Sequence, residues 1–436
     1  MSASSSAGVR GRIEAVERLI RIQDEGAFAG LVGRAGLPKD VERVATAFVG
    51  NVTRWKRWLD HLAETCYRGE YRSLEPAVRE LLRVGTYDLA VAGTAPHAAV
   101  HQAVEAARLH VRPGAGKLVN AVLRALDRKK PWLSFEDDGS ADALAVRWSH
   151  PTWMVKRWLR RFGVDDTRAL LMWNNRPPAY SVRVAAERGD LERFLEEEHV
   201  PWRSSRWLDD YVQVDRLQPL VRAGWIQRGD AVVQDESAGL IVRLVDAQAG
   251  ETIVDACAAP GGKSRYLIER MDRSGRLIAI DASASRLRLL EDMPGPIERV
   301  AADFRDWASS HQGMADRVLV DAPCTGLGVL AGRADLRWRR SPEDFAQLAP
   351  LQRELMDAAA GVVRPGGLFV YSTCSIAPEE NELQAEAFLE RHAGFEAESA
   401  LDSVPDKLVT DAGHLATLPQ RDGIDGAFGA RFRRLG

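Results

Sequence analysis

Residues 252–264 of the chain read Thr-Ile-Val-Asp-Ala-Cys-Ala-Ala-Pro-Gly-Gly-Lys-Ser, an apolar run followed by a pair of glycines. The apolar run predicts a short strand, and the residues after the glycines predict a helix. Glycines let a backbone approach a ligand closely, and the first turn of a helix offers N–H groups that lack partners. We therefore predict a strand–turn–helix unit that binds a nucleotide-like cofactor at the turn.

Strands and helices continue to alternate beyond this unit. Apolar runs predict strands at Thr252–Asp255, Leu277–Asp281, Arg299–Asp303, Arg317–Asp321 and Leu368–Thr373. Because strands separated by helices form parallel sheets covered on both faces, residues 231–436 are predicted to form an α/β, Rossmann-like domain. Such sheets bind ligands at the carboxyl ends of their strands. Polar residues lie at or just beyond these ends, namely Asp255, Asp281, Asp303, Asp321 and Cys374.

The rest of the chain predicts two further domains. Residues 1–135 show no strand-like alternation, and apolar residues recur at helical spacing, for example from Val78 to Leu89, so an all-α bundle is expected. A polar, acidic linker follows. Residues 141–230 combine a helix that begins near His150 with a strand at Tyr180–Val184, which predicts a small α+β module.

Composition limits the classes of function. A chain of 436 residues with a net charge of −3 does not coat nucleic acid through bulk charge, although net charge does not exclude a local basic groove. Its four cysteines include no Cys-x-x-Cys pair, so we expect neither a disulfide framework nor a metal site. No apolar run approaches ~18 residues and the first residues contain no apolar leader. We therefore expect a cytoplasmic protein without a membrane partner.

Three classes of cofactor compete for the glycine turn. A dinucleotide would require Gly-x-Gly-x-x-Gly, which is absent, and a P-loop NTPase would require a glycine where Cys257 stands. S-adenosylmethionine needs no phosphate cradle, but it needs an acid for its ribose hydroxyls. Asp281 follows Gly262 by about 20 residues, the spacing expected of such an acid, and Asp303 would then face the adenine. Each aspartate could instead merely cap a helix, so the prediction rests on the set.

Two cysteines have polar surroundings, Cys324 in Asp-Ala-Pro-Cys-Thr-Gly and Cys374 in Tyr-Ser-Thr-Cys-Ser. Nearby backbone N–H groups can lower the pKa of a thiol, and the thiolate is the nucleophilic form. Addition of a thiolate to carbon 6 of a cytosine makes carbon 5 able to accept a methyl group. Asp321 could stabilise that adduct near N3, and the second thiol could help to resolve it. Spacing alone does not decide which cysteine attacks.

These motifs resemble those of the bacterial ribosomal RNA small-subunit methyltransferase B family, also called Sun or Fmu. The resemblance rests on Asp255–Lys263, Asp321–Cys324, Tyr371–Ser375 and Pro378-Glu-Glu-Asn381, and on an N-terminus similar to a NusB-type RNA-binding domain. It implies that Cys374 is the nucleophile and that Cys324 aids product release. DNA cytosine-5 methyltransferases use a Pro-Cys nucleophile, which gives the alternative assignment.

The resemblance also implies a cofactor and a substrate. S-adenosylmethionine would be held by Cys257, Ala258, Ala259, Pro260, Gly261, Gly262, Lys263, Asp281, Asp303 and Asp321. The substrate would be 16S ribosomal RNA, methylated at carbon 5 of an unpaired or flipped cytosine, since the base must leave its stack to reach a thiol. We expect a monomer that does not act on DNA. Alternatives are another RNA such as tRNA, or a non-catalytic RNA-binding antitermination or assembly factor.

An arginine-rich segment follows the Cys324 motif. Its members could hold phosphate and stack a base, or could form only a solvated charged surface. They are Arg333, Arg337, Trp338, Arg339 and Arg340.

Overall fold

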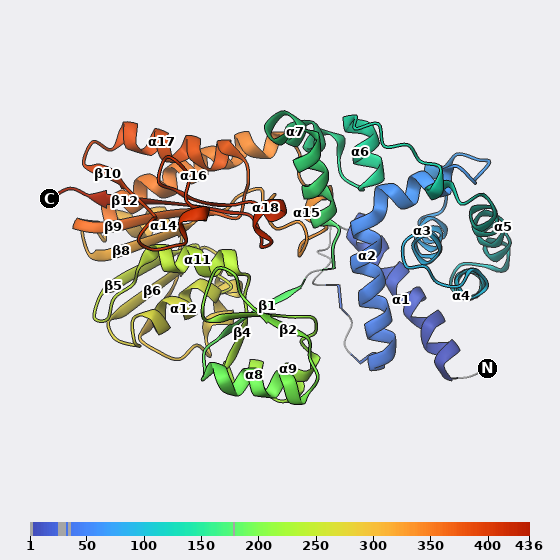
Figure 1. Ribbon diagram of the computed structural model, residues 1–436, viewed down its shortest axis with the longest axis horizontal. Coiled ribbons are helices and arrows are strands. Elements are labelled where there is room, and N and C mark those ends of the chain that lie inside the picture. The colour runs from blue at the N-terminus through green and yellow to red at the C-terminus, as the bar shows by residue number, and fades with distance from the viewer. Residues whose placement is uncertain (1–2, 25–31, 34–35, 178) are drawn as a thin grey trace. The chain divides into compact units, whose positions relative to one another are not determined.

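The computed structural model describes residues 3–24, 32–33, 36–177 and 179–436 (Figure 1). It divides into two compact units. The first comprises Met1–Arg176 together with Arg333–Arg339, and the second comprises Pro177–Gly332 and Arg340–Gly436. A short segment from the later part of the chain therefore belongs to the N-terminal unit. Within the described residues, no helix combines the length and the apolar character needed to span a membrane.

The first unit is helical. Three of its helices begin with proline, which is favourable at the first helical position because its missing N–H would have no partner there. The helices are α1 (Ala3–Asp24), α2 (Lys39–Glu64), α3 (Pro76–Ala90), α4 (Pro96–His110), α5 (Pro113–Lys129), α6 (Ala141–Arg147), α7 (Thr152–Asn174) and the short α15 (Leu336–Arg339). Two of these, α6 and α7, come from the range expected to open the middle module.

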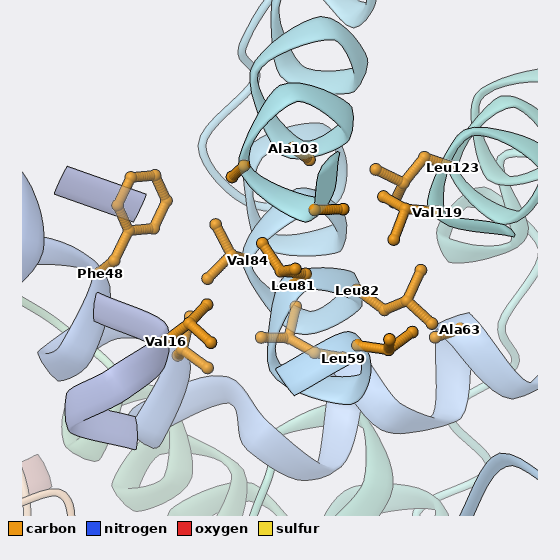
Figure 2. Close-up of a cluster of buried hydrophobic side chains, with 14 of the residues drawn as sticks. Val16, Phe48, Leu59, Ala63, Leu81, Leu82, Val84, Ala103, Val119 and Leu123 are labelled. Carbon is orange, nitrogen blue, oxygen red and sulfur yellow. The ribbon is translucent and has the colours of Figure 1, made fainter. Parts of the chain in front are cut away.

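Aliphatic side chains from the first five helices form one core (Figure 2). Leu59 of α2, Leu81 of α3 and Leu123 of α5 are fully buried in it. The predicted apolar face from Val78 to Leu89 lies inward, as the helical spacing indicated. The expectation of an all-α N-terminal bundle is therefore confirmed.

The second unit contains a small antiparallel sheet with the order β2-β3-β1-β4. Its strands are β1 (Tyr180–Val184), β2 (Trp202–Ser204), β3 (Tyr211–Val214) and β4 (Ala231–Val233), accompanied by α8 (Arg188–Glu197), α9 (Gln218–Arg222) and α10 (Trp225–Arg228). The predicted strand at Tyr180–Val184 is confirmed, and it pairs with both β3 and β4.

The larger sheet of this unit has the order β10-β12-β9-β8-β5-β6-β7, with β11 paired to β12. From β9 to β7 the pairs are parallel, and β12 pairs antiparallel with β9. The strands are β5 (Thr252–Ala256), β6 (Arg276–Asp281), β7 (Ile297–Ala301), β8 (Ala315–Asp321), β9 (Val363–Thr373), β10 (Phe395–Glu398), β11 (Leu415–Thr417) and β12 (Ala427–Arg434).

Helices cover both faces of this sheet. Successive side chains of a strand point to opposite faces, so Ile253 packs with α11 and α12 while Val254 packs with α14, α16 and α17. The helices of residues 231–436 outside the first unit are α11 (Glu236–Val245), α12 (Gly262–Arg270), α13 (Ala284–Leu287), α14 (Phe304–Ser309), α16 (Glu343–Val362), α17 (Glu382–Arg391) and α18 (Pro419–Asp422). The predicted doubly covered, Rossmann-like α/β domain is confirmed.

One predicted strand is shifted. The run expected at Arg299–Asp303 forms a strand at Ile297–Ala301 instead. Asp303 lies beyond it and caps α14, because its Oδ1 atom accepts a hydrogen bond from the Arg305 N–H at 2.9 Å. Asp303 is therefore set two residues past the end of the strand, in a position that its capping role explains.

Candidate active site

The glycine turn leaves β5 and enters α12 where the sequence predicted a turn. Gly261 has φ +100°, and a Cβ there would lie 2.6 Å from Cγ of Leu290, so only glycine fits. The N–H of Ala258 donates to the carbonyl of Ile280 at 2.9 Å, which ties the turn to β6. Gly262 begins α12, and Pro260 is exposed. The turn is a backbone cradle at the carboxyl ends of two parallel strands.

Asp281, at the end of β6, lies against this turn. Its Oδ2 atom accepts from the N–H of Ala259 at 3.1 Å and its Oδ1 atom accepts from the N–H of Ser283 at 2.8 Å. Arg286 donates to the carbonyl of Ala259 at 2.5 Å. The structure thus brings the predicted ribose-binding acid to the turn, where it also supports the backbone.

Asp255 is buried at the end of β5. Its Oδ2 atom accepts a hydrogen bond from Oγ of Ser264 at 2.5 Å, but its Oδ1 atom has no partner among the described residues. Burial raises the pKa of Asp255 to about 7. A buried acceptor left without a donor beside a glycine turn fits a ligand that brings its own polar groups, as an amino-acid-bearing nucleoside such as S-adenosylmethionine would.

Lys263 connects the glycine turn to the Cys324 motif. Its Nζ atom lies 2.7 Å from Oδ2 of Asp321, and Ser372 donates to the other oxygen of Asp321 at 2.9 Å. Burial opposes the charge of Lys263, but the ion pair with Asp321 outweighs burial and raises the pKa of the lysine. Sequence reasoning placed both residues in the cofactor site without recognising this pair.

Cys324 and Cys374 lie together. Their Sγ atoms are 3.3 Å apart, although 50 positions separate them in the sequence. The loops that carry them follow β8 and β9, which are parallel neighbours in which Asp321 pairs with Ser372. Parallel neighbours end at the same edge of a sheet, so the topology itself brings the two thiols to one place.

A backbone hydrogen bond from Cys374 lowers the pKa of the Cys324 thiol, as expected, but two other effects outweigh it. Its hydrogen bond with Cys374 and its burial raise its pKa well above the ordinary value. Burial also raises the pKa of Cys257 to about 12, with the carboxylates of Asp321 and Asp281 adding to the effect. Cys257 is therefore held as a neutral thiol, which suits a structural place in the turn.

The Cys374 loop is locked by close backbone packing. The N–H of Gly328 donates to the carbonyl of Cys374 at 3.0 Å, and the N–H of Gly426 donates to the carbonyl of Gly328 at 2.9 Å. A Cβ at position 328 would lie 2.3 Å from the carbonyl oxygen of Gly426. Two chain segments far apart in sequence thus meet the cysteine loop through glycine.

Sequence reasoning missed two residues that contact the cysteine loops. Glu380 and Asn381 are buried and hydrogen-bond to residues flanking Cys324 and Cys374. They lie in the motif Pro378-Glu-Glu-Asn381, which supported the family resemblance but suggested no role for either side chain.

The arginine-rich segment does not form a single RNA-binding surface. Arg337 is fully buried in the first unit and donates to the carbonyl of Asn174 at 2.9 Å and to Oδ1 of Asn175 at 2.8 Å. Trp338 donates to the carbonyl of Thr53 at 2.7 Å. Burial lowers the pKa of Arg337 well below its ordinary value. Neither expected alternative holds for Arg337, because its side chain is fully buried and used in packing.

Arg340, in the second unit, has a different role. It donates to the carbonyl of Thr325 at 2.8 Å and to the carbonyl of Cys324 at 3.2 Å, so it holds the Cys324 loop.

Among the residues that the structure describes, no group of three or more His, Cys, Asp or Glu side chains could hold a metal ion.

Comparison with known proteins identifies all three regions. A family model described as 16S rRNA methyltransferase RsmB/F matches residues 242–433. A NusB family model matches residues 10–128, and the ferredoxin-like domain of RsmF/B-like methyltransferases matches residues 150–220. The fold and the glycine turn therefore define a Rossmann-like methyltransferase joined to a NusB-type helical domain.

Relatives match over most of the chain. A probable ribosomal RNA small subunit methyltransferase B of Bacillus subtilis (strain 168) is 30% identical over 97% of this chain and 98% of its own length. Ribosomal RNA small subunit methyltransferase B of Vibrio cholerae is 36% identical over 71% of this chain and 72% of its own. The crystal structure of PH0851 is 26% identical, with a TM-score of 0.81 over the whole of both chains. The chain belongs to the ribosomal RNA small subunit methyltransferase B family.

Proposed function

We propose that the protein transfers a methyl group from S-adenosylmethionine to carbon 5 of a cytosine in 16S ribosomal RNA. Family membership supports a ribosomal RNA substrate. The observation that carries the cytosine-5 chemistry is the 3.3 Å separation of the Cys324 and Cys374 thiols beside a cofactor-type glycine turn. One thiol suffices for nucleophilic attack, and a second at this distance provides a group for resolving the adduct.

The turn and the acids around it would hold S-adenosylmethionine. Residues 257–263 would approach it through the backbone, Asp281 would bind the ribose hydroxyls, and Asp303 would lie near the adenine. Bound there, the cofactor supplies an electrophilic methyl group. The Oδ1 atom of Asp255, which has no partner in the described part of the chain, supports a polar ligand at this position.

The protein groups then act in two stages. Sγ of Cys374 bonds to carbon 6 of the cytosine, and the electron pair of the carbon 5–carbon 6 double bond becomes available at carbon 5 for the methyl group. Asp321 would hydrogen-bond the ring near N3, from the position in which Lys263 and Ser372 fix it. Bonding of Cys374 to carbon 6 removes the thiol partner that raises the pKa of Cys324, so Cys324 would then release its own proton to solvent. It would take the carbon 5 proton, after which the double bond re-forms and the bond from Sγ of Cys374 breaks.

The same proposal covers the form of the substrate. A cytosine stacked in a helix cannot present carbon 6 to a side chain, so an unpaired or flipped cytosine is required. We assign orientation of the RNA to the NusB-type domain, residues 1–135, and to the module at 141–230, with chemistry confined to residues 231–436. We also propose a monomer that acts in the cytoplasm, where small subunits are assembled.

Methyl transfer with a labelled cofactor tests the proposal. Purified protein is mixed with methyl-labelled S-adenosylmethionine and either 16S ribosomal RNA, tRNA or duplex DNA, and the products are digested to nucleosides. We expect label in 5-methylcytosine from 16S ribosomal RNA alone. Label in another nucleoside would contradict the chemistry, and label from tRNA would contradict the substrate. A parallel ATP hydrolysis assay tests the P-loop alternative, and RNA binding without any methylation would favour an assembly factor.

A further inference from the structure

Two adjacent side chains, Glu380 and Asn381, connect the Cys324 loop and the Cys374 loop to the start of α17. Glu380 ends a short 3-10 turn, η4 (Pro378–Glu380), and Asn381 directly precedes α17. Glu380 is 0% exposed and Asn381 is 3% exposed. Buried polar side chains are stable only where hydrogen bonds satisfy them, so their partners indicate what they do.

Glu380 holds the Cys324 loop. Its Oε1 atom accepts from the N–H of Thr325 at 2.8 Å, and its Oε2 atom accepts from Oγ1 of Thr325 at 2.5 Å. Gln352 donates to Glu380 at 3.2 Å and to the carbonyl of Pro323 at 2.9 Å. The residues on both sides of Cys324 are thus fixed through one carboxylate and its partner amide.

Asn381 holds the Cys374 loop in the same way. Its Oδ1 atom accepts from Oγ1 of Thr373 at 2.6 Å, and its Nδ2 atom donates to the carbonyl of Ser375 at 3.0 Å. Thr373 in turn accepts from the N–H of Ser375 at 3.2 Å. Both neighbours of Cys374 are therefore tied to a single amide.

The chemical nature of these residues matters as well as their place. A carboxylate accepts stronger hydrogen bonds than a neutral amide, and Glu380 receives three of them without a cationic partner among the described residues. An apolar side chain that only filled this space would leave the N–H of Thr325 without its acceptor. The acceptor at position 380 therefore holds the loop as well as filling the space.

We propose that Glu380 and Asn381 are positioning residues that set the separation of the two thiols, Glu380 through Thr325 and Asn381 through Thr373 and Ser375. The proposal rests on the proposed function for its catalytic consequence. The positioning itself concerns the protein without RNA or cofactor, so it can be tested separately. Small displacements of reacting groups reduce rates strongly, by roughly 100-fold for about 1 Å.

Phenylarsine oxide measures the thiol separation directly. It bonds to two thiols held close together and releases water, whereas isolated thiols bind it weakly. The full-length protein is titrated with it while free thiols are counted. We expect one arsenical per wild-type chain, and none of this tight binding in Cys324→Ala or Cys374→Ala. Asn381→Ala and Glu380→Ala should weaken it by roughly tenfold or more. Glu390→Gln, an exposed change on α17, the helix that follows Asn381, should leave it unchanged.

Glu380→Gln separates positioning from folding. Its amide oxygen can still accept from the Thr325 N–H, so it should keep tight arsenical binding and most of the single-turnover methylation rate that Glu380→Ala loses. In the alanine variants kcat should fall by roughly 10–100-fold, with KM for RNA within about twofold of wild type. Wild-type arsenical binding and kcat in both alanine variants would overturn the proposal, as would a Glu380→Gln variant that is well folded yet as impaired as Glu380→Ala.

The two proposals fail differently. Tight arsenical binding by the wild type that is lost in the alanine variants, together with no 5-methylcytosine from any RNA, would reject the proposed function and retain the positioning. Formation of 5-methylcytosine, together with wild-type arsenical binding in Glu380→Ala and Asn381→Ala, would retain the proposed function and reject the positioning.

Discussion

The Sγ atoms of Cys324 and Cys374 lie 3.3 Å apart at the carboxyl edge of a parallel sheet. The strands that precede them, β8 and β9, are paired in register, so the 50-residue separation in sequence becomes a direct contact in the fold. Lys263 reaches the same edge from α12 and pairs with Asp321. The glycine turn and the two thiols are therefore built on neighbouring strand ends.

Gly328 should be essential for the position of the Cys374 loop. A Cβ at this residue would lie 2.3 Å from the carbonyl oxygen of Gly426 and 2.8 Å from that of Cys374, and neither backbone atom can rotate away. Gly328→Ala should therefore lower the methylation rate by roughly tenfold or more. Gly332→Ala is the matched control, since its nearest neighbour is 3.9 Å away. Equal single-turnover rates in the two variants would show that the close packing has no catalytic consequence.

Asp281 should contribute directly to cofactor affinity. Hydrogen bonds to a charged acceptor contribute about 1.5–3 kcal/mol each, and a factor of ten in affinity corresponds to about 1.4 kcal/mol. Asp281→Ala should weaken S-adenosylmethionine binding at least about tenfold by calorimetry. Because Asp281 also accepts from the N–H of Ala259, circular dichroism must show that the fold is retained. Unchanged affinity would remove Asp281 from the site.

Asp255 should make stability depend on pH. Burial raises its folded-state pKa to about 7, so the folded protein holds this proton more tightly than the unfolded chain. The stabilisation that protonated Asp255 contributes to the fold is fully present below about pH 4 and is lost as pH rises through about 7. As pH rises from about 5 to about 8, the free energy of unfolding of Asp255→Asn, measured in urea, should therefore increase by roughly 2–4 kcal/mol relative to that of wild type. Exposed Asp402→Asn is the control, and a pH-independent difference for Asp255→Asn would contradict the raised pKa.

Arg337 should be a stability residue of the first unit. Its guanidinium donates to the carbonyls of Arg54, Ser149 and Asn174 in a fully buried position. Replacement by methionine removes these three buried hydrogen bonds, at a cost of about 0.5–1.5 kcal/mol each. The melting temperature of Arg337→Met should fall by roughly 5 °C or more, by scanning calorimetry. Arg333→Met, an exposed change in the same segment, is the control and should keep the wild-type melting temperature. A wild-type melting temperature in Arg337→Met as well would show that Arg337 does not stabilise the first unit.

The sequence correctly predicted the features that depend on residues close together in the chain. The glycine turn, the strand preceding it and the α/β alternation follow from apolar runs and glycines that are neighbours in sequence. Strand pairing then brought Cys324 and Cys374 together, as expected for polar residues at the ends of parallel strands. The strand shift to Ile297–Ala301 reflects a competing local preference, because Asp303 forms a helix cap rather than a strand end.

Long-range contacts explain what was missed. Arginines in a charged run suggest a solvated or RNA-binding surface, and nothing near Arg337 in sequence indicates that its partners lie about 160 residues away. Glu380 meets Thr325 across 55 positions, which spacing within one motif cannot reveal. The raised pKa of Cys324 has the same origin, because it comes first from a hydrogen bond with the thiol of Cys374, in the loop after the neighbouring strand.

Covalent trapping separates the roles of the two thiols. Cys324→Ala should still attack through Cys374 and accept the methyl group, then stall because no thiol removes the carbon 5 proton. Cys374→Ala should form no adduct, and neither should the double variant.

The most direct measurement is a denaturing gel of Cys324→Ala incubated with 16S ribosomal RNA and S-adenosylmethionine. We predict a slowly migrating protein–RNA band that requires the cofactor, disappears on ribonuclease treatment and is absent from Cys374→Ala. A band in Cys374→Ala and none in Cys324→Ala would exchange the two assignments. Absence of a band from both single variants, with full methylation activity in each, would contradict covalent catalysis by these cysteines.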